Sequence, residues 1–582
     1  MTGSPKKADP RSSAETAKCS SRKTARSIAQ AFALVAGCFP YEAGQCHMKH
    51  AVIIGGGHNG LVCAWYLAAA GHKVTVLEKN DTVGGAAITE EFHPGFRNSV
   101  ASYTVSLLNP KVITDLELHR HGLNIVERRM GNFLPLPDGR ALEAGPGRTK
   151  ASVAQFSTRD AEALDGFDRM LENAANVLRD LLLRTPPNVT EGNWLAAVPE
   201  LLKAASLGRQ FAELSLDARR DVLDLFTCSA AEILDRWFES DPVKALFGFD
   251  GIVGNWNSPM APGTGYVLLH HYFGEVNGKQ GVWGHAIGGM GAITDAMRKA
   301  CEEKGVVVKT GTPVARIEAG KTSVTAVIAE DDARIEADLV VSNIHPKLLV
   351  SNLLEDAPLP EDFRRRIGYW QSGSGTFRMN VALDALPTFT ARPEPGDHLS
   401  AGIIIAPSLD YMDRAYLDSR AHGWSRQPIV EMLIPSTLDP TLAPEGKHVA
   451  SLFCQHVAPQ LPDDFPGGAS WDHHKEAVAD LMIGTVDRHA PGFARSVIGR
   501  QVLSPLDLER KLSLVGGDIF HGKLSLNQLF SARPVLGYGA YRAPLKGLYM
   551  CGSSTHPGGG VTGVPGHNAA REILSDIRAR RV

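Results

Sequence analysis

The chain has 582 residues, which is more than one ordinary domain holds, and we expect two or three folding units. Hydrophobic residues make up 43% of the sequence and charged residues 21%, a balance that suits a buried core and a hydrated surface. The formal net charge of -3 gives no sign of a nucleic-acid-binding surface. No apolar stretch is long enough to cross a bilayer as a helix, so we expect neither a spanning helix nor nucleic acid as a partner.

Residues 1–47 differ in composition from the rest and are rich in Ser, Lys and Arg. The run Val35-Ala36-Gly37-Cys38 resembles a bacterial lipoprotein cleavage box, and the basic stretch before it resembles the start of a signal or transit peptide. We favour a third interpretation, a disordered or non-native leader. Met48 directly precedes the first strand-like run and has the position of a natural start.

A glycine-rich motif, Gly55-Gly56-Gly57-His58-Asn59-Gly60, stands between a strand-like run at 51–54 and a helical segment at 61–70. A second strand-like run, 74–77, ends on the acid Glu78. This order predicts a strand–turn–helix–strand unit that binds a dinucleotide. A glycine motif alone is weak evidence, and an ordinary structural turn is the alternative, but here the whole unit occurs in the expected order.

Each position of this motif has a mechanical role in the predicted site. Gly55 permits the tight turn, Gly57 lets the backbone approach a pyrophosphate, and Gly60 allows close helix–strand packing. The backbone N–H groups near His58 and Asn59 belong to a helix N-terminus, which favours a bound phosphate.

The segment 78–87 indicates which dinucleotide binds. Glu78 is placed at the strand end to accept hydrogen bonds from a ribose. Gly84 and Gly85 suit a loop that passes close to a cofactor without side-chain obstruction, although a surface turn is the alternative. The run, which includes Lys79 and Ala86, resembles the flavoprotein superfamily of amine oxidases and bacterial-type phytoene desaturases. That resemblance implies FAD, because NAD-only dehydrogenases do not normally carry this segment.

Helical and strand-like segments follow in turn. Apolar residues recur at helical spacing from 161 to 183, and helical sequence continues to about residue 249. The cofactor domain is expected to resume near Gly288 with a helix and short strand-like runs. Among these runs, the superfamily resemblance places Val314 at the adenine, contacted through its backbone. From about 346 to 533 the sequence predicts mixed α/β structure with an antiparallel sheet.

We therefore predict an α/β fold with a Rossmann-type FAD-binding domain that is discontinuous in sequence and a mixed α/β substrate domain. The cofactor parts are expected at 48–140, 281–345 and 536–582. The substrate parts are expected at 141–280 and 346–535.

The eight cysteines are spread along the chain and form neither a C-x-x-C pair nor a zinc motif. This favours a reducing compartment and disfavours disulfide reductase chemistry, which needs a redox dithiol beside the flavin. The glycines at 288–291 are not expected to form a second dinucleotide motif, because Gly284 and His285 interrupt the sequence before them. Adjacent pairs such as His270-His271 point in different directions, so no metal site is predicted.

Near the C-terminus a strand-like run leads into a glycine-rich turn and a helix from about Val561. A helix N-terminus there would favour the negative charge of reduced flavin. The run 551–561 closely resembles the C-terminal signature of bacterial-type phytoene desaturases, with Ser553 and Gly559 as departures from the commonest pattern. The resemblance implies that Gly552 and Val561 bind the cofactor.

The sequence does not identify the catalytic residues. His556, in the glycine-rich turn, is a weak candidate for a proton carrier, and shaping the flavin-facing loop is its better-supported role. Trp283, His285 and Tyr103 are further candidates near the flavin. In a flavin oxidoreductase the flavin performs the redox step, while the protein orients the substrate and tunes the flavin.

The resemblance extends from about residue 50 to the end of the chain. The segments 236–240, 263–271 and 438–444 are similar to the family of pyridine nucleotide-disulfide oxidoreductase domain-containing protein 2 and, less closely, to cyanobacterial-type beta-carotene ketolases. The first family lacks the disulfide pair of its name. Its members are FAD oxidoreductases, mitochondrial in animals, whose substrate is not settled.

The resemblance implies an FAD-dependent oxidoreductase of the phytoene desaturase type, which transfers a hydride between flavin and a carbon–carbon bond of an apolar, polyene- or lipid-like substrate. An amine oxidase, a carotenoid ketolase and a low-turnover flavoprotein acting as a regulator are the alternatives. We expect a cytoplasmic protein, mitochondrial if the source is eukaryotic, with peripheral membrane contact. The sequence gives neither the electron acceptor nor the oligomeric state.

Overall fold

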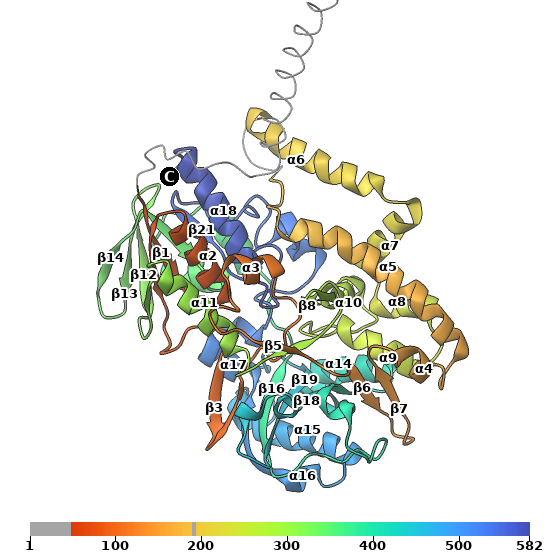
Figure 1. Cartoon of the computed structure of the whole chain (residues 1–582). Coiled ribbons are helices and arrows are strands. Elements are labelled where there is room, and N and C mark those ends of the chain that lie inside the picture. The colour runs from red at the N-terminus through yellow and green to blue at the C-terminus, as the bar shows by residue number, and fades with distance from the viewer. Residues whose placement is uncertain (1–47, 189–193) are drawn as a thin grey trace, which may run out of the picture. The chain divides into compact units, whose positions relative to one another are not determined.

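The computed structural model describes residues 48–188 and 194–582, and residues 48–582 form one compact unit (Figure 1). The interpretations of the leader concern residues outside this described part of the chain.

The first sheet has five parallel strands in the order β11-β2-β1-β15-β21. Their bounds are Val307–Lys309 (β11), Lys73–Leu77 (β2), His50–Ile54 (β1), Leu339–Ser342 (β15) and Leu548–Met550 (β21). Ala51, Val52 and Ile53 are fully buried, as is typical of parallel strands covered on both faces. The strand order changes direction at β1, and ligands bind at the carboxyl ends of strands beside such a point. The predicted Rossmann-type fold is confirmed.

Three of the helices that contribute to the core around this sheet are α2 (His58–Ala69), α11 (Gly291–Glu303) and α18 (Val564–Arg578), and α2 contacts both of the others (Figure 1). α18 crosses α2 closely because Gly566 has no side chain: a Cβ there would lie 2.1 Å from the carbonyl oxygen of Asn59. The helix predicted from about Val561 begins only at Val564. Val561 and Gly563 have φ angles of 59° and 73°, which a right-handed helix cannot contain.

The second sheet has seven strands in the order β20-β16-β19-β18-β17-β6-β7 and is antiparallel except for the β17–β6 pair. The strands are Val497–Leu503 (β20), Phe377–Leu383 (β16), His448–Val457 (β19), Trp424–Leu433 (β18), Gly402–Ile405 (β17), Asn132–Pro135 (β6) and Ala141–Ala144 (β7). Helices α14 (Leu409–His422) and α15 (Lys475–His489) pack against it (Figure 1). The antiparallel sheet expected within 346–533 is present, and it also includes β6 and β7. The boundaries between cofactor and substrate parts stay a prediction, because residues 48–582 form one compact unit.

Helices dominate the segment between residues 158 and 272: α5 (Thr158–Leu182), α6 (Trp194–Glu213), α7 (Leu216–Thr227), α8 (Ala230–Trp237), α9 (Asp241–Gly248) and α10 (Thr264–Tyr272). The helix predicted at 161–183 is α5, which begins earlier because the Ser157 hydroxyl caps the Asp160 N–H at 3.0 Å. Phe167 is fully buried against Trp237 and Phe238, with ring centroids 5.9 and 5.0 Å away.

Shorter strands and α-helices lie between these elements. They are the strands β3 (Thr89–His93), β4 (Phe96–Ser99), β5 (Ile125–Glu127), β8 (Glu275–Val276), β9 (Lys279–Gln280), β10 (Gly284–Ala286), β12 (Val314–Ala319), β13 (Val324–Ala329) and β14 (Arg334–Glu336), and the helices α3 (Pro110–Asp115), α4 (Thr149–Val153), α12 (Pro346–Leu348), α13 (Glu361–Gly368), α16 (Phe493–Ser496) and α17 (Pro505–Leu512). A short strand, β10, lies before Gly288, where the sequence predicted no strand-like run long enough for a second dinucleotide motif. It pairs antiparallel with β5, outside the parallel sheet, so the turn at Gly288 does not repeat the strand–turn–helix unit of β1.

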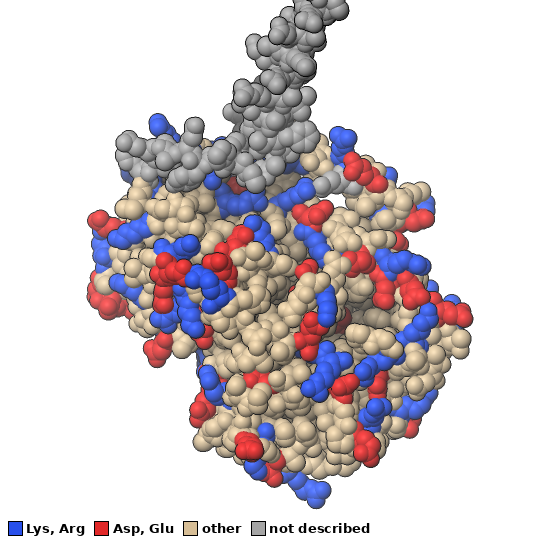
Figure 2. All heavy atoms as spheres, viewed as in Figure 1, with Lys and Arg blue, Asp and Glu red and all other residues tan. Residues whose placement is uncertain are grey.

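Figure 2 shows Lys and Arg side chains interspersed with Asp and Glu over one face of the molecule. Ion pairs form between such residues in the described chain, for example between Arg120 and Glu303 at 2.7 Å. Among the described residues, no helix combines the length and apolar character that crossing a membrane requires.

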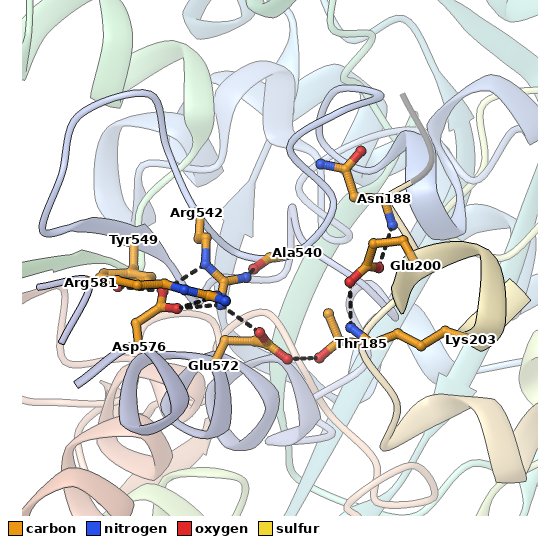
Figure 3. A network of polar contacts seen from close by, with 10 residues as sticks. All are labelled: Thr185, Asn188, Glu200, Lys203, Ala540, Arg542, Tyr549, Glu572, Asp576 and Arg581. Carbon is orange, nitrogen blue, oxygen red and sulfur yellow. Dashed lines mark hydrogen bonds and ion pairs between the residues drawn. The ribbon is translucent and has the colours of Figure 1, made fainter. Parts of the chain in front are cut away.

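An ion-pair network joins α18 to the segment before β21 and to the end of α5 (Figure 3). Arg542 donates from Nε to Asp576 at 2.6 Å and from Nη2 to Glu572 at 2.7 Å. Tyr549 donates to Asp576 at 2.9 Å, and Thr185 donates to Glu572 at 2.6 Å. Burial alone would raise the pKa of Asp576, but the hydrogen bonds and charge of Arg542 outweigh it and lower the pKa.

Candidate functional site

A cavity of about 430 Å³ begins at the carboxyl ends of β1 and β2 and reaches the second sheet. Gly55 and Glu78 line it at the first sheet, and Asn132, Glu431 and Phe453 line it at the second. Its volume lies in the range of small-molecule sites. Its position beside the change of strand order is where open parallel sheets bind ligands.

The glycine-rich turn forms the wall of the cavity after β1. Gly57 is the N-cap of α2, with φ -70° and ψ 167°, which any residue can adopt. The nearest atom to a Cβ at Gly57 would be Asn343 Nδ2 at 3.0 Å, with the next atoms 3.9 Å away. A Cβ at Gly60 would instead lie 2.3 Å from the carbonyl oxygen of Gly55. Gly57 therefore leaves space toward the cavity, whereas Gly60 is required for close packing.

Glu78 is buried at the end of β2 and is held in a fixed orientation. Its Oε2 accepts a hydrogen bond from the Gly56 N–H at 2.8 Å, and its Oε1 accepts one from the Asn80 N–H at 3.0 Å. The loop that follows approaches the turn, because the Gly84 N–H donates to the Gly56 carbonyl at 2.9 Å. Gly84 and Gly85 have φ angles of 133° and 57°, which explains the glycine pair.

Most residues predicted to bind the cofactor lie around this one cavity: Gly55, Gly57, His58, Asn59, Glu78, Lys79, Gly84, Gly85, Ala86, Val314 and Val561. Gly60 and Gly552 do not line it. A Cβ at Gly552 would lie 3.1 Å from the Asn343 carbonyl oxygen, so Gly552 serves packing between the loops after β15 and β21. A contact of these two residues with the cofactor stays a prediction. The roles of the others stay predictions.

His556, the weak catalytic candidate, does not line the cavity. Its Nε2 lies 3.1 Å from the Leu181 carbonyl oxygen, and burial lowers its pKa to about 4. His285 is also outside the cavity lining and lies 3.2 Å from Asp439, whose Oδ2 also accepts the Gly288 N–H at 2.7 Å. Both histidines therefore hold loops in place. The other two candidates, Tyr103 and Trp283, do line the cavity.

The geometry favours a different histidine, His521. It lines the cavity, and its buried Nδ1 has no hydrogen-bond partner among the described residues. Its φ of 55° is uncommon for a residue other than glycine and is a pointer to function. Asp518 braces the loop, accepting the N–H groups of Phe520 at 2.8 Å and Gly522 at 3.1 Å. Burial and, second, the charge of Arg533 lower the pKa of His521 to about 4, so its ring is neutral at pH 7.

The end of the cavity at the second sheet carries charged side chains. The Tyr103 hydroxyl donates to Glu431 at 2.5 Å, and Arg128 donates from Nη2 to the Thr104 hydroxyl at 2.5 Å. Burial raises the pKa of Glu431 and lowers that of Arg128. Burial, and then the nearby charge of Glu431, raise the pKa of Asp250 to about 8. These groups could orient a polar part of a substrate.

Cys63 and Cys551 lie close enough for their thiols to interact, although they are far apart in the sequence. Both are fully buried, and burial raises the pKa of Cys551. Neither lines the cavity, so this pair is not exposed to a ligand there.

The model of one protein family, described as flavin containing amine oxidoreductase, matches residues 60–377. The chain belongs to this family. It is 38% identical to pyridine nucleotide-disulfide oxidoreductase domain-containing protein 2 of Rattus norvegicus, over 91% of this chain and 94% of the relative. It is 24% identical to the phytoene desaturase (lycopene-forming) of Pantoea ananas, over 91% of this chain and 100% of the relative.

Among solved structures, cyclohexylamine oxidase from Brevibacterium oxydans IH-35A is similar in fold. The TM-score is 0.54 at 15% identity, with 92% of this chain and 99% of that chain covered. At this identity the likeness shows the fold alone.

The chain is an FAD-dependent oxidoreductase, and its residues fit that cofactor. The turn after β1 leaves space at Gly57 for a pyrophosphate, and the Glu78 carboxylate faces the same cavity for a ribose. His58 Nε2 and Asn59 Oδ1 are buried there without hydrogen-bond partners among the described residues, as expected of groups that a ligand satisfies.

Sequence reasoning missed Arg128, Asp250, Glu431 and His521. A signal existed for Glu431, because it interrupts the apolar strand 429–433 and a charged residue in such a run needs an explanation. The others come from separate elements, and nothing in their local sequence indicates that they meet.

Proposed function

We propose that this protein transfers a hydride between flavin and a carbon–carbon bond of an apolar, lipid- or polyene-like substrate. The proposal rests on one observation: one continuous cavity extends from the glycine-rich turn after β1 to an apolar wall. That wall includes Phe249, Val253, Phe453 and Phe520. Aromatic and aliphatic linings suit apolar ligands. Similarity to a phytoene desaturase supports the same reaction class.

In the desaturating direction, the substrate loses a hydride from one carbon and a proton from its neighbour, and a carbon–carbon double bond forms. FAD supplies the oxidant for this step by taking the hydride with its electron pair. A quinone or molecular oxygen could then remove the electron pair. We assign His521 to hold the proton, because this residue lines the cavity, its ring is neutral at pH 7, and its Nδ1 has no hydrogen-bond partner among the described residues.

The proposal is tested by mixing the purified flavoprotein anaerobically with a polyene, an apolar lipid or a primary amine and following the flavin absorption band. We expect bleaching by a polyene or lipid. His521→Gln should retain flavin but slow the bleaching about 100-fold or more, the usual contribution of a proton-transfer group. Bleaching by amines alone would overturn the proposal, and so would a His521→Gln variant as fast as the unaltered protein.

Amine oxidation is the second candidate. Glu431 and Asp250 line the cavity and could bind an ammonium group, and the fold is shared with a cyclohexylamine oxidase. In that case Glu431→Gln should abolish bleaching by the amine while a polyene or lipid remains without effect.

Peripheral membrane contact belongs to the same proposal. α6 and α7 expose apolar side chains, among them Leu202 at 66% and Leu223 at 59% exposure. We expect the flavoprotein to float with lipid vesicles and the double variant Leu202→Glu, Leu223→Glu to float less, with unchanged flavin content. Equal flotation of both proteins would count against membrane contact through these helices. A cytoplasmic or, in a eukaryote, mitochondrial location would suit such a protein.

A further inference from the structure

Arg128, which is partly buried, differs from the fully buried Arg378 and Arg533 in what its guanidinium contacts. Arg533 donates to the Ser553 carbonyl at 2.7 Å and to the Phe520 carbonyl at 2.9 Å. Arg378 donates to the Leu452 carbonyl at 3.0 Å and also to a serine hydroxyl. Their charges are thus surrounded by acceptors that the fold supplies, whereas Arg128 has no such set.

The backbone holds Arg128 in place while its side chain faces the cavity. Its N–H donates to the Trp283 carbonyl at 3.0 Å, and its guanidinium carbon lies 5.7 Å from the Trp283 ring centroid. Among the described residues, its one side-chain hydrogen-bond partner is the Thr104 hydroxyl, and no ion pair within 4.0 Å joins it to a carboxylate. A charge placed this way is costly unless a partner of opposite charge joins it.

The Arg128 guanidinium lies near two other polar side chains from different elements, and the three meet beside Gly402. A Cβ at Gly402 would lie 3.4 Å from Arg128 Nη1, 3.0 Å from Glu431 Oε1 and 2.8 Å from Asn132 Oδ1. All three side chains line the cavity. They therefore form a polar end to a space whose other walls include Phe249 and Phe453.

Glu431 is shared between two arginines: burial raises its pKa, and the charge of Arg128, the Tyr103 hydrogen bond and the charge of Arg378 oppose that rise. Its Oε2 accepts the Tyr103 hydroxyl at 2.5 Å, and the Arg378 guanidinium carbon lies 4.4 Å from the Tyr103 ring centroid. Asp250 is the other carboxyl group at this end. Burial keeps it mostly protonated at pH 7, since its pKa is raised to about 8. Arg128 and Arg378 together then outnumber the single negative charge of Glu431.

We propose that the substrate has an apolar body that ends in a carboxylate, and that Arg128 binds this carboxylate. The proposal rests on the proposed function, because it names the substrate class of the same cavity. A planar guanidinium can donate two parallel hydrogen bonds to a carboxylate, and the pairing would neutralise the excess positive charge. The aromatic walls would hold the apolar body.

Binding to the flavoprotein tests this without requiring turnover. Titration calorimetry is done with dodecanoate, methyl dodecanoate and dodecylamine, which differ only in the terminal group. We expect dodecanoate to bind at least about tenfold more tightly than the ester. Arg128→Gln should weaken dodecanoate binding about 10- to 100-fold and leave the ester unchanged. Arg128→Lys should restore part of the loss.

Arg129→Gln is the matched control, because Arg129 is exposed and does not line the cavity. It should bind all three compounds as the unaltered protein does. Flavin content and melting temperature show whether each variant is folded. If Arg128→Gln does not fold, Arg128→Lys against Arg129→Gln still gives the comparison, since a lysine keeps the charge but not the paired hydrogen bonds.

Equal affinity for acid and ester, tightest binding of dodecylamine, or equal weakening of acid and ester by Arg128→Gln would each overturn the inference. Its failure and that of the proposed function are distinguishable. If Arg128 does not bind a carboxylate but a neutral apolar compound bleaches the flavin anaerobically, the proposed reaction stands. If dodecanoate binds through Arg128 but no lipid or polyene bleaches the flavin, Arg128 binds a carboxylate as proposed and the proposed reaction is wrong.

Discussion

Two groups of charged residues in this molecule are built differently. At the C-terminal helix, Arg542 contacts both Asp576 and Glu572, and Tyr549 and Thr185 complete the network (Figure 3). At the second sheet, Arg128 faces a cavity with one hydroxyl partner among the described residues. The first arrangement is complete within the chain, and the second is completed only by a ligand.

This difference separates structural from functional polar groups. A network with every partner present stabilises the fold and needs nothing further. A buried charge that lacks partners reduces stability, and a protein keeps it where it binds or reacts. The two glycines of the cofactor turn divide in a similar way, since a Cβ at Gly60 would meet the Gly55 backbone at 2.3 Å, whereas one at Gly57 would meet the Asn343 side chain at 3.0 Å.

The largest effect is expected from Gly57→Val. The Gly57 backbone angles suit valine, and the nearest atom to a new Cβ is Asn343 Nδ2 at 3.0 Å. The variant should therefore fold, but its side chain would occupy the space of the pyrophosphate and FAD should be lost almost completely. Flavin absorbance per polypeptide and circular dichroism measure the two outcomes.

Gly60→Ala is the contrasting variant. Its Cβ would lie 2.3 Å from the Gly55 carbonyl oxygen, so we expect a destabilisation of about 1–3 kcal/mol or more, although Gly60 does not line the cavity. A Gly57→Val protein that keeps full flavin occupancy would contradict our placement of the cofactor.

The sequence allowed the cofactor half to be predicted well, because the turn after β1 is a local structure. Gly55, Gly57 and Glu78 lie within one short unit, and their order determines their geometry. The polar end of the cavity is different, since Arg128, Asp250 and Glu431 come from a loop, a helical turn and a strand. Their meeting depends on how the seven-stranded sheet takes in β6, which local pattern does not reveal.

The same limit applies to the catalytic candidates. His556 lies in a conspicuous glycine-rich motif, yet its ring is turned to the Leu181 carbonyl. His521 lies in an inconspicuous loop, and its role depends on a positive φ and a brace from Asp518. Neither feature can be read from neighbouring residues alone.

The second prediction compares the two arginines directly. Arg542→Met removes bonds to Asp576, whose side chain is 3% exposed, and should destabilise the protein by about 2–4 kcal/mol. This expected loss of stability is smaller than for a fully buried ion pair, because the Arg542 side chain is 33% exposed. Arg128→Gln should cost less stability in the ligand-free flavoprotein, because it loses one hydroxyl partner and the attraction to Glu431 but no direct ion pair.

Urea denaturation of both variants measures this difference. Flavin content should be the same in Arg542→Met as in the unaltered protein. A larger loss of stability in Arg128→Gln than in Arg542→Met would mean that Arg128 is a structural residue. It would contradict the distinction drawn here between Arg542 and Arg128.

The smallest effect concerns pH and Asp250. Its pKa is raised from an ordinary value to about 8, first by burial and then by Glu431. The folded state therefore binds a proton that the unfolded chain releases near pH 4, so this group makes stability fall as the pH rises from about 4 to about 8. Above pH 8 the ionised Asp250 adds negative charge to an end of the cavity that also holds Glu431, Arg128, Tyr103 and His271.

A carboxylate ligand should consequently bind more weakly above pH 8, by about tenfold or less, because the added charge repels it in a partly hydrated cavity. Asp250→Asn cannot ionise, so dodecanoate affinity in that variant should stay constant between pH 7 and pH 9. The ester has no charge and should show no pH dependence in either protein. If Asp250→Asn loses dodecanoate affinity with pH as the unaltered protein does, the titrating group is another residue. The charge balance that favours a carboxylate would then have to be assigned again, beginning with Glu431, whose pKa burial also raises.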